Sequence, residues 1–457
     1  MLKTVLIANR GEIAIRIARS AADAGIRSVA IHAEDDADGL HRFKADASVA
    51  LAARGARAYL DAGAIVAAAL HAGCDAIHPG YGFLSENASF AERCEAAGLR
   101  FVGPTPETLA LFGDKARARD LAVRCGVPVA AGTAGSIDLP QARAFLDGLG
   151  PGGSVMVKAV AGGGGRGMRA VRSIDELDAA WERCRSEAMA SFGADGLYAE
   201  AFVARARHIE VQVVGDGRGD CVHLFERDCS AQRQRQKLVE FAPALGLAPD
   251  LREALFDSAL RMAREVRLRS LCTFEFLVSD ALPDGFIFIE ANPRLQVEHT
   301  VTEAVLGVDL VRTQFDLAAG RTLAELGFAQ AAIGLPRGQA VQMRINLETM
   351  QPDGSALPGG GVLEAFEPPS GGGVRVETHG YPGYAPGPGY DSLLAKVIVQ
   401  DRDPAALLAR AYRALCEFRI EGVPVNLGFL QNLLLRPELR DGRIDTGFVE
   451  AHAATLA

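Results

Sequence analysis

Polar side chains recur at every second position where an apolar stretch ends, between residues 286 and 298. The stretch begins Phe-Ile-Phe-Ile, and the polar residues that follow are Glu290, Asn292, Arg294, Gln296 and Glu298. To the extent that this segment is extended, these side chains project from one face of it. Pro293 cannot donate a ladder hydrogen bond, so we expect the regular sheet to loosen there. Burying so many polar groups without partners would be costly, so they must face solvent, each other or a bound ion.

A further carboxylate lies on the strand expected just upstream. Glu275 stands in the apolar run at 272–277, and a Pro-Asp-Gly turn at 283–285 follows it. Antiparallel pairing of the two strands would bring Glu275 near Glu290. Two carboxylates and the Asn292 carbonyl are hard oxygen ligands that suit Mg²⁺ bridging phosphates. An exposed amphipathic hairpin is the alternative, but the flanking Phe and Ile residues favour burial.

A run of glycines at 162–167 offers a different chemistry. Adjacent glycines have no Cβ to keep a ligand away, and their N–H groups can cradle phosphate oxygens. The spacing fits neither a dinucleotide fingerprint nor a P-loop, and a flexible hairpin tip is the alternative. Lys158 precedes the run, and only six of the 48 basic residues are lysine. Where lysine remains in such a chain, a compact point charge is favoured, so we predict a phosphate-binding lid.

Charged residues also fill the segment 226–237. A solvated charge run is the usual meaning of such a segment, but Lys237 is another of the six lysines. The preceding segment at 207–213 alternates like a strand and carries His208. A single histidine of this kind is more often structural than a ligand.

The elements that would position these groups begin with alternating strands and helices. This rhythm predicts a parallel sheet covered by helices, with ligands at the carboxyl ends of its strands. The loops at 9–12 and 78–87 would lie there, although the first could be a plain strand-to-helix turn. The expected strands are 4–8, 28–32 and 76–77, and the expected helices begin near residue 11 and cover 64–70.

The rest of the chain is predicted to contain both strands and helices. Residues 114–210 favour a small sheet between helices, and residues 209–298 are strand-rich with one helix near 251–266. From about residue 339, strands with Gly/Pro turns precede helices near 405–418 and 427–435.

Composition excludes several classes of protein. The net charge is −9, from 57 acidic and 48 basic residues, which argues against a broad nucleic-acid-binding surface. Eight scattered cysteines without a Cys-x-x-Cys pair argue against a zinc ribbon or a disulfide scaffold, and fit a reducing cytosol. There is no run of 18 apolar residues and no leader-like N-terminus, so we expect neither a transmembrane helix nor a signal peptide.

Six motifs occur together in the order found in biotin carboxylases, from Lys3 to about Val449. The chain therefore resembles a biotin carboxylase subunit or domain of a biotin-dependent carboxylase, within the ATP-grasp superfamily. The motifs are Asn-Arg-Gly-Glu-Ile-Ala at 9–14, His-Pro-Gly-Tyr-Gly-Phe-Leu-Ser-Glu-Asn at 78–87, the lysine and glycine lid at 158–168, Glu-Arg-Asp-Cys-Ser at 226–230, Glu-Ala-Asn-Pro-Arg-Leu-Gln-Val-Glu-His at 290–299 and Tyr-Asp-Ser at 390–392.

The resemblance implies an α/β fold in three domains. Residues 1–112 would form an N-terminal, Rossmann-like parallel-sheet domain. Residues 113–330 would form an ATP-grasp domain, whose mobile glycine-rich lid subdomain covers about 130–203. Residues 331–457 would form a C-terminal mixed α+β domain.

It also implies roles for individual residues. Glu298 would be the base, and Arg344 would stabilise the biotin enolate, with Arg294 and Lys237 as further catalytic groups. Mg²⁺ would be held by Glu275, Glu290 and Asn292. Bicarbonate would be held by Lys237, Arg294, Gln296, Val297 through its backbone, and Glu298. The nucleotide would be held by Lys115, Lys158, Gly163, Gly164, Glu200, Ala201, Phe202, Val203, His208, Gln232, Arg235, Glu275 and Glu290.

The implied reaction is carboxylation of biotin with bicarbonate and ATP. Mg²⁺ (or Mn²⁺) would assist, carboxyphosphate would form first, and biotin would arrive on a carrier protein or domain. No Ala-Met-Lys-Met sequence occurs, so we expect no biotin attached to this chain. A carboxyltransferase would complete the reaction, most simply of the acyl-CoA type, in a cytoplasmic homodimer or larger assembly that binds neither nucleic acid nor membrane.

Five positions depart from the usual pattern of the family. They are Ala201 in place of lysine, Gln234 in place of arginine, Arg235 in place of histidine, Phe241 in place of an acidic residue and Gln339 in place of histidine. These changes bear on nucleotide contacts more than on the reaction. Two alternatives stay open: another ATP-grasp ligase of the carbamoyl-phosphate type, and a nucleotide-binding subunit without turnover.

Overall fold

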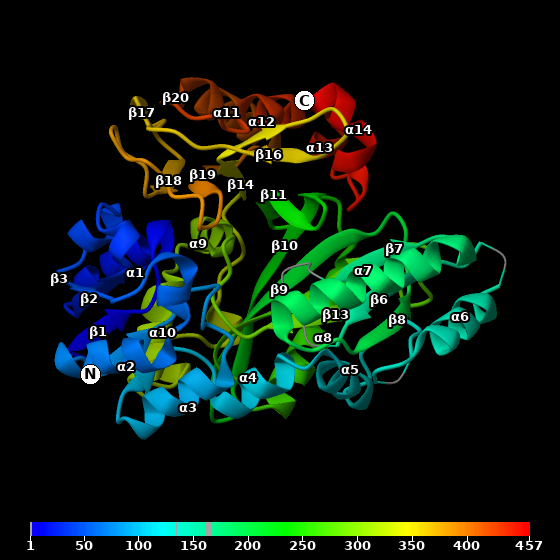
Figure 1. Cartoon of the computed structure of the whole chain (residues 1–457), viewed down its shortest axis with the longest axis horizontal. Coiled ribbons are helices and arrows are strands. Elements are labelled where there is room, and N and C mark those ends of the chain that lie inside the picture. Colours follow the sequence, from blue (N-terminus) through cyan, green and yellow to red (C-terminus); the bar gives the residue numbers. More distant parts are fainter. Residues whose placement is uncertain (1, 134, 151, 161–166) are drawn as a thin grey trace.

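The structure is a computed structural model that describes residues 2–133, 135–150, 152–160 and 167–457 of the chain. The first part is a parallel sheet with the strand order β3-β2-β1-β4-β5, covered by helices (Figure 1). Its elements are β1 (Thr4–Ile7), α1 (Gly11–Asp23), β2 (Arg27–His32), β3 (Ala47–Ala50), α2 (Ala62–His71), β4 (Ala76–His78), α3 (Ala88–Ala96), β5 (Arg100–Phe101) and α4 (Pro106–Phe112).

The predicted parallel sheet is confirmed, although its short outer strands β3 and β5 were not predicted. The loops after β1 and β4 meet at one edge, as expected for carboxyl ends of parallel strands. The side-chain amide of Asn9 donates to the carbonyl oxygens of Pro79 and Tyr81, each at 2.7 Å. These two hydrogen bonds fix the two loop motifs against each other.

A small antiparallel sheet follows, with the strand order β7-β6-β8. Helices α6 and α7 contribute apolar side chains such as Leu146 and Trp181 to the same core as Val155 and Val157. The predicted lid residues Gly163 and Gly164 lie outside the described residues. The elements are α5 (Lys115–Arg124), α6 (Leu139–Gly148), β6 (Val155–Ala159), β7 (Met168–Val171), α7 (Ile174–Phe192) and β8 (Leu197–Ala201).

The largest element is an eight-stranded antiparallel sheet in the order β13-β12-β9-β10-β11-β14-β19-β18. It runs without a break from the central part of the chain into the C-terminal part, because β11 pairs with β14. Its strands are β9 (Arg207–Asp216), β10 (Cys221–Arg233), β11 (Gln236–Ala242), β12 (Arg269–Val278), β13 (Phe286–Asn292), β14 (Gln339–Asn346), β18 (Val374–Thr378) and β19 (Leu393–Asp401).

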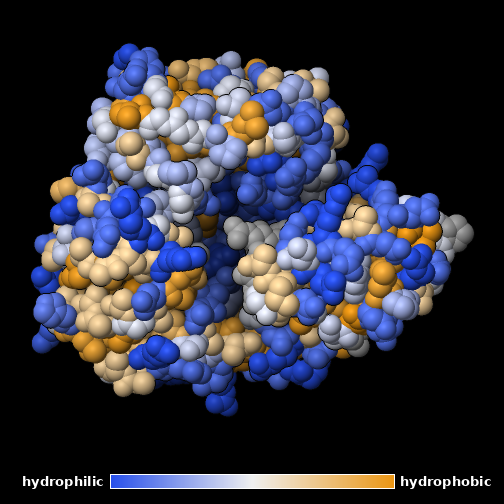
Figure 2. Space-filling model, viewed as in Figure 1, coloured by the Kyte–Doolittle hydropathy of each residue, from blue (hydrophilic) through white to orange (hydrophobic). Residues whose placement is uncertain are grey.

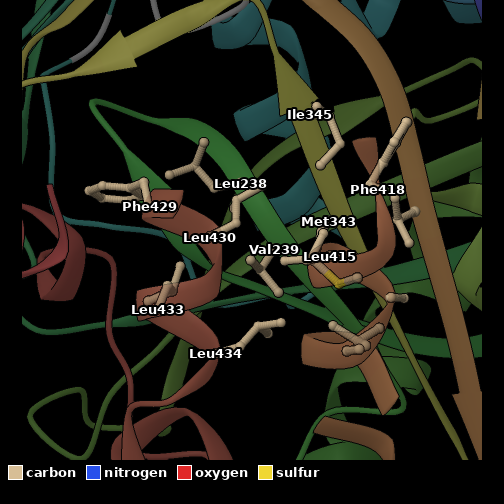
Figure 3. Close-up of a cluster of buried hydrophobic side chains, with 14 of the residues drawn as sticks. Leu238, Val239, Met343, Ile345, Leu415, Phe418, Phe429, Leu430, Leu433 and Leu434 are labelled. Atoms are coloured by element: carbon tan, nitrogen blue, oxygen red, sulfur yellow. The ribbon is translucent and has the colours of Figure 1, made fainter. Parts of the chain in front are cut away.

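Helices and short hairpins cover this sheet. Figure 3 shows the apolar contact between strands β11 and β14 and helices α11 and α12, where Leu238, Met343, Leu415 and Leu430 meet. The remaining elements are α8 (Pro249–Glu265), α9 (His299–Leu306), α10 (Leu310–Ala318), β15 (Glu348–Met350), β16 (Ala356–Pro358), β17 (Ala365–Glu367), α11 (Pro404–Glu417), β20 (Arg419–Glu421), α12 (Leu427–Leu434), α13 (Pro437–Arg440) and α14 (Phe448–Leu456), together with five short 3₁₀ helices at 34–36, 40–43, 55–60, 324–326 and 330–332.

Two interpretations of the sequence need correction. The five polar residues of 290–298 do not share one strand, because β13 ends at Asn292 and α9 begins at His299. Pro293, which has no N–H for a sheet, marks the point of departure. The segment 226–237 is not a solvated charge run either, because most of its side chains in β10 are buried.

The surface view shows a hollow at the centre of one face, between the N-terminal part, the C-terminal part and the part that carries β6 and α7 (Figure 2). Its visible interior is largely hydrophilic, whereas apolar side chains fill the cores on either side. Across the described ranges, no helix combines the length and the apolar character that crossing a bilayer requires.

Phe276 tests the core beneath the large sheet. Its ring on β12 is fully buried and makes edge contacts with Phe286 and Phe288 on the neighbouring strand. We expect Phe276→Ala to lower the free energy of unfolding by about 3–5 kcal/mol, because apolar burial is lost and a cavity remains. Leu335→Ala, at a side chain that is 81% exposed, should change it by less than about 0.5 kcal/mol. Denaturant titration measures both, and equal effects would contradict this description of the core.

Candidate active site

A single ammonium group organises the polar cluster on one face of the large sheet. Lys237 Nζ lies 2.6 Å from Glu210 Oε2, 3.1 Å from Glu275 Oε1 and 2.6 Å from Glu298 Oε1. All three carboxylates are buried. Buried carboxylates this close together are stable only with a positive charge among them, so the folded site requires Lys237.

The register of the sheet brings these groups together. Glu290 on β13 lies opposite Glu275 on β12, Glu275 lies opposite Glu210 on β9, and Glu210 lies opposite Arg227 on β10. Residues directly opposite in neighbouring strands project from the same face. The predicted pairing of Glu275 with Glu290 is therefore confirmed, and it belongs to a row of charges across four strands.

Arg227 closes this row at one end. Its guanidinium is fully buried and donates to Glu210 at 2.5 Å and to Gln212, Thr302 and Thr273 at 2.9–3.1 Å. Burial alone would lower the pKa of Arg227, but the charge of Glu210 raises it above its ordinary value. Arg227 therefore stays charged and holds Glu210 in place beneath Lys237.

Glu298 lies at the start of helix α9, between two cations. Its Oε1 contacts Lys237, and its Oε2 accepts from Arg344 Nη2 at 3.0 Å. Burial alone would raise the pKa of Glu298, but Lys237 and Arg344 hold it well below its ordinary value. The side chain is thus a charged carboxylate at neutral pH.

Arg344 reaches this position from β14, in the part of the sheet nearer the C-terminus. Its Nε donates to Glu240 Oε1 on β11 at 2.5 Å, so two carboxylates hold one guanidinium. Burial lowers the pKa of Arg344, yet the charges of Glu240 and Glu298 raise it above its ordinary value. The structure brings the predicted base and the predicted enolate-stabilising residue into direct contact.

Arg294 and Gln296 lie in the turn between β13 and α9. Arg294 Nη1 donates to Gln296 Oε1 at 2.8 Å, and Nη2 donates to Asn292 Oδ1 at 3.2 Å. Its Nε lies 3.3 Å from Glu86 Oε2, in the loop after β4. The turn that ends the strand therefore gathers a guanidinium and two side-chain amides beside the carboxylates.

Predicted nucleotide-binding residues of the small sheet lie on, or directly after, its paired strands β6 and β8. Lys158 on β6 forms an ion pair with Glu200 on β8. Ala201 ends β8, so Phe202 and Val203 follow the strand rather than extend it, and the Phe202 N–H donates to Ser154 O at 2.8 Å. Lys115, at the start of α5, lies 3.8 Å from Glu290 Oε2.

The remaining predicted nucleotide-binding residues lie in the large sheet or in a turn of it, and one of them contacts the small sheet. His208 Nε2 lies 2.6 Å from Glu275 Oε2, and Gln232 Nε2 lies 3.4 Å from His208 Nδ1. Burial alone would lower the pKa of His208, but Glu275 raises it. Arg235, in the turn between β10 and β11, donates to the Met168 carbonyl at 3.0 Å and so links the large sheet to the small one.

The oxygen atoms of Glu275, Glu290 and Asn292 are of the kind that binds a hard divalent cation. Glu275 and Glu290 face the same side of the sheet, and the Asn292 amide nitrogen donates to Glu275 Oε1 at 2.8 Å, which holds this carboxylate beside the end of β13. Carboxylate and amide oxygens are the ligands that Mg²⁺ prefers. The side chain of Glu290 is 34% exposed, so it remains accessible to a ligand.

Sequence reasoning missed several members of the cluster. Glu210 and Glu240 each alternate with apolar neighbours on strands that could be recognised, which is the available signal. Arg227 was hidden in a segment that resembles a charged surface. The sequence suggests no role for Glu12 or Lys396, because only the tertiary structure pairs them and brings Lys396 to the Val297 carbonyl.

Family comparisons match three consecutive stretches of the chain. Residues 1–109 match "Biotin carboxylase, N-terminal domain", residues 114–326 match "Carbamoyl-phosphate synthase L chain, ATP binding domain", and residues 342–451 match "Biotin carboxylase C-terminal domain". Mitochondrial pyruvate carboxylase of Mus musculus is 45% identical over 454 residues. That alignment covers 98% of this chain but 38% of the relative, so the chain spans little more than a third of such a relative's length.

Two solved structures extend the comparison. The biotin carboxylase domain dimer of Hydrogenobacter thermophilus 2-oxoglutarate carboxylase, in complex with MgADP, ADP and bicarbonate, has a TM-score of 0.95 and 40% identity, covering 100% of this chain and 99% of that one. A single-chain, multi-domain long-chain acyl-CoA carboxylase has a TM-score of 0.87 and 43% identity, covering 100% of this chain and 43% of that one.

Replacing Lys237 with methionine tests the electrostatics of the cluster. The pKa values of Glu275 and Glu298 lie below 4.5 in the folded chain. Their contribution to stability is therefore complete above about pH 4.5 and is lost as the pH falls through the lower folded values. Lys237→Met removes the positive charge that opposes the effect of burial. The pKa values of Glu275 and Glu298 would therefore both rise.

We therefore expect Lys237→Met to unfold at a higher pH than the unchanged chain during acid titration followed by circular dichroism. Lys44→Met, at an exposed lysine, is the control and should leave the acid transition in place. Coincident acid transitions for Lys237→Met and the unchanged chain would contradict this account of the site.

Proposed function

The chain belongs to the biotin carboxylase family, and from this premise we propose that it carboxylates biotin on a carrier with bicarbonate, using ATP and Mg²⁺. The reaction proceeds through carboxyphosphate and is the first half-reaction of a biotin-dependent carboxylase. One observation carries this proposal: the buried carboxylate of Glu298 contacts the cations of both Lys237 and Arg344.

Bicarbonate is a poor nucleophile at neutral pH, because its hydroxyl keeps its proton. Glu298 is the residue that removes this proton as bicarbonate attacks the terminal phosphate of ATP. Lys237 and Arg294 supply positive charge for the anion, and Gln296 and the backbone of Val297 complete its recognition by hydrogen bonds. Their convergence around the start of α9 supports this assignment.

The nucleotide is held between the small sheet and the large one. Lys115, Lys158, His208 and Gln232 support this placement, because they line the two sheets on the side of Glu275 and Glu290. Glu275, Glu290 and Asn292 would hold Mg²⁺, which when bound would neutralise charge on the phosphoryl group. The H. thermophilus relative, solved with MgADP and bicarbonate, supports the same ligands here.

Arg344 acts on biotin in the second step. Carboxyphosphate breaks down to CO₂ and phosphate, the phosphate takes the proton of the ureido nitrogen, and this nitrogen attacks CO₂. Deprotonation places negative charge on the ureido oxygen, and a guanidinium stabilises that charge through directed N–H groups. Arg344 is suited to this task because Glu240 fixes its Nε while Nη2 points to Glu298. The base and the oxyanion-stabilising group therefore share one small space.

The partners follow from the chemistry of a half-reaction. A biotin carboxyl carrier and a carboxyltransferase must be present on other subunits or domains, and the dimer formed by the H. thermophilus biotin carboxylase domain supports a homodimer. The sequence alone favours an acyl-CoA acceptor, but similar proteins include a pyruvate carboxylase and a 2-oxoglutarate carboxylase as well as an acyl-CoA carboxylase, so the comparisons do not support this choice. The carboxyltransferase is therefore proposed to choose the acceptor. A cytoplasmic location stays a prediction.

The two alternatives are less well supported. The match of residues 114–326 to a carbamoyl-phosphate synthase ATP-binding domain fits another ATP-grasp ligase, but the flanking biotin carboxylase matches favour carboxylation of biotin. A subunit without turnover has no need for a charged base held against Arg344. An ATPase assay with ammonia, amino acids or biotin separates the three.

Removing the base should abolish the first step. We expect the unchanged chain to release ADP in a bicarbonate-dependent reaction that biotin stimulates, and Glu298→Gln to lower kcat by about 10²–10⁴-fold. Glu226→Gln is a matched control, because Glu226 is an equally buried glutamate paired with Arg252 away from Lys237. Coupled measurement of ADP checks both; an active Glu298→Gln variant would contradict the role of the base.

Replacing Arg344 should separate the two steps. In Arg344→Met, biotin carboxylation should fall by about 10²–10³-fold, because a donor to the ureido oxygen is lost. Bicarbonate-dependent ATP hydrolysis without biotin should fall less, since Lys237 still contacts Glu298. Carboxybiotin and ADP are measured in parallel. An equal loss of both activities would show that Arg344 serves only to orient Glu298.

A further inference from the structure

Lys396 lies fully buried in the middle of β19, where lysine is rarely found. It stands directly opposite Arg344 on β14, so two cations share one face of the sheet. Like charges directly opposite each other are destabilising. A buried lysine in this position needs a compensating contact and, in a chain with six lysines, a reason for its presence.

The contacts of Lys396 come from two other parts of the chain. Its Nζ lies 3.0 Å from Glu12 Oε1, in helix α1, and donates to the Val297 carbonyl oxygen at 3.0 Å. Glu12 is itself buried and accepts a hydrogen bond from the Tyr81 hydroxyl. The ammonium also lies 5.9 Å from the centre of the Tyr81 ring.

The Val297 carbonyl belongs to the peptide unit that joins Val297 to Glu298. Glu298 is the residue that precedes α9, and its carboxylate contacts Lys237 and Arg344. A hydrogen bond from a buried ammonium fixes the plane of this peptide. It thereby sets the direction in which the Glu298 side chain leaves the backbone.

We propose that Lys396 and Glu12 are positioning residues that orient the Val297–Glu298 peptide for bicarbonate. Lys396 acts through the Val297 carbonyl. Glu12 neutralises the Lys396 ammonium and holds it in hydrogen-bonding distance of that carbonyl. Tyr81 holds Glu12 in turn. This gives a function to Glu12 and Tyr81, which belong to the motifs at 9–14 and 78–87 and have no role of their own in the proposed chemistry. The inference rests on the proposed function, because it concerns recognition of bicarbonate.

The test removes both charges together, so that neither is left buried alone. In Lys396→Met/Glu12→Gln, the KM for bicarbonate should rise about tenfold or more, because small displacements of reacting groups are costly. The KM for ATP should change by less than about twofold, since no nucleotide-binding residue contacts this pair. A role in stability alone would lower the melting temperature and leave the bicarbonate KM in place.

A matched pair supplies the control. Arg10 lies 2.6 Å from Asp36, which accepts a hydrogen bond from Tyr59 at 2.8 Å, so a cation, a carboxylate and a tyrosine hydroxyl also meet beside the start of α1. Arg10→Met/Asp36→Asn should lower the melting temperature and leave the bicarbonate KM within about twofold. An equal rise in this KM for the control pair would overturn the proposal, as would an unchanged KM in Lys396→Met/Glu12→Gln.

Two further measurements keep the outcome decisive. If the double variant does not fold, Glu12→Gln alone should still raise the bicarbonate KM by about threefold, because Lys396 loses its ionic partner, and no rise overturns the proposal. If the unchanged chain shows no turnover, the proposed function fails, and calorimetric titration of bicarbonate in the presence of MgADP takes the place of KM. Equal affinities of the unchanged chain and the variant would then overturn the inference.

Discussion

The site depends on one ammonium group that three buried carboxylates share. Each of Glu210, Glu275 and Glu298 would be expensive to bury as an anion, and together they would repel one another. Lys237, at 2.6–3.1 Å from all three, offsets both costs. Arg227 and Arg344 neutralise the outer members of the group. The cluster therefore keeps a carboxylate charged where a base is needed.

The continuous sheet explains how distant segments build this cluster. Strands β9, β12 and β13 supply a row of carboxylates, while β11 and β14 supply Glu240 and Arg344. Because these strands are hydrogen-bonded in one sheet, Glu240 and Arg344 are held in fixed register, and Glu298 reaches Arg344 from the start of α9. Helix α1 and strand β19 add a further pair of charges, Glu12 and Lys396. Through this pair, Lys396 links the N-terminal part to the Val297 carbonyl.

Much of this arrangement could be predicted from the sequence, for identifiable reasons. The period of two around Glu290 and the turn at 283–285 predicted the pairing with Glu275, because strand geometry is local. The same period was extended too far, since Pro293 ends the strand and Glu298 reaches the site from a helix start. Lys237 was recognised by the scarcity of lysine. Lys396 shares that signal, but its partners at 12 and 297 are far away in sequence and could not be inferred.

The central claim is that the cluster keeps Glu298 ionised at neutral pH. Carbon-13 NMR of the glutamate carboxyl groups, with the Glu298 resonance assigned by its absence in a glutamine variant, measures this directly. We expect a chemical shift typical of a carboxylate, unchanged between about pH 5.5 and 8. A Glu298 resonance that titrates with a midpoint above about pH 6 would contradict it, because the group would then not be held charged by Lys237 and Arg344.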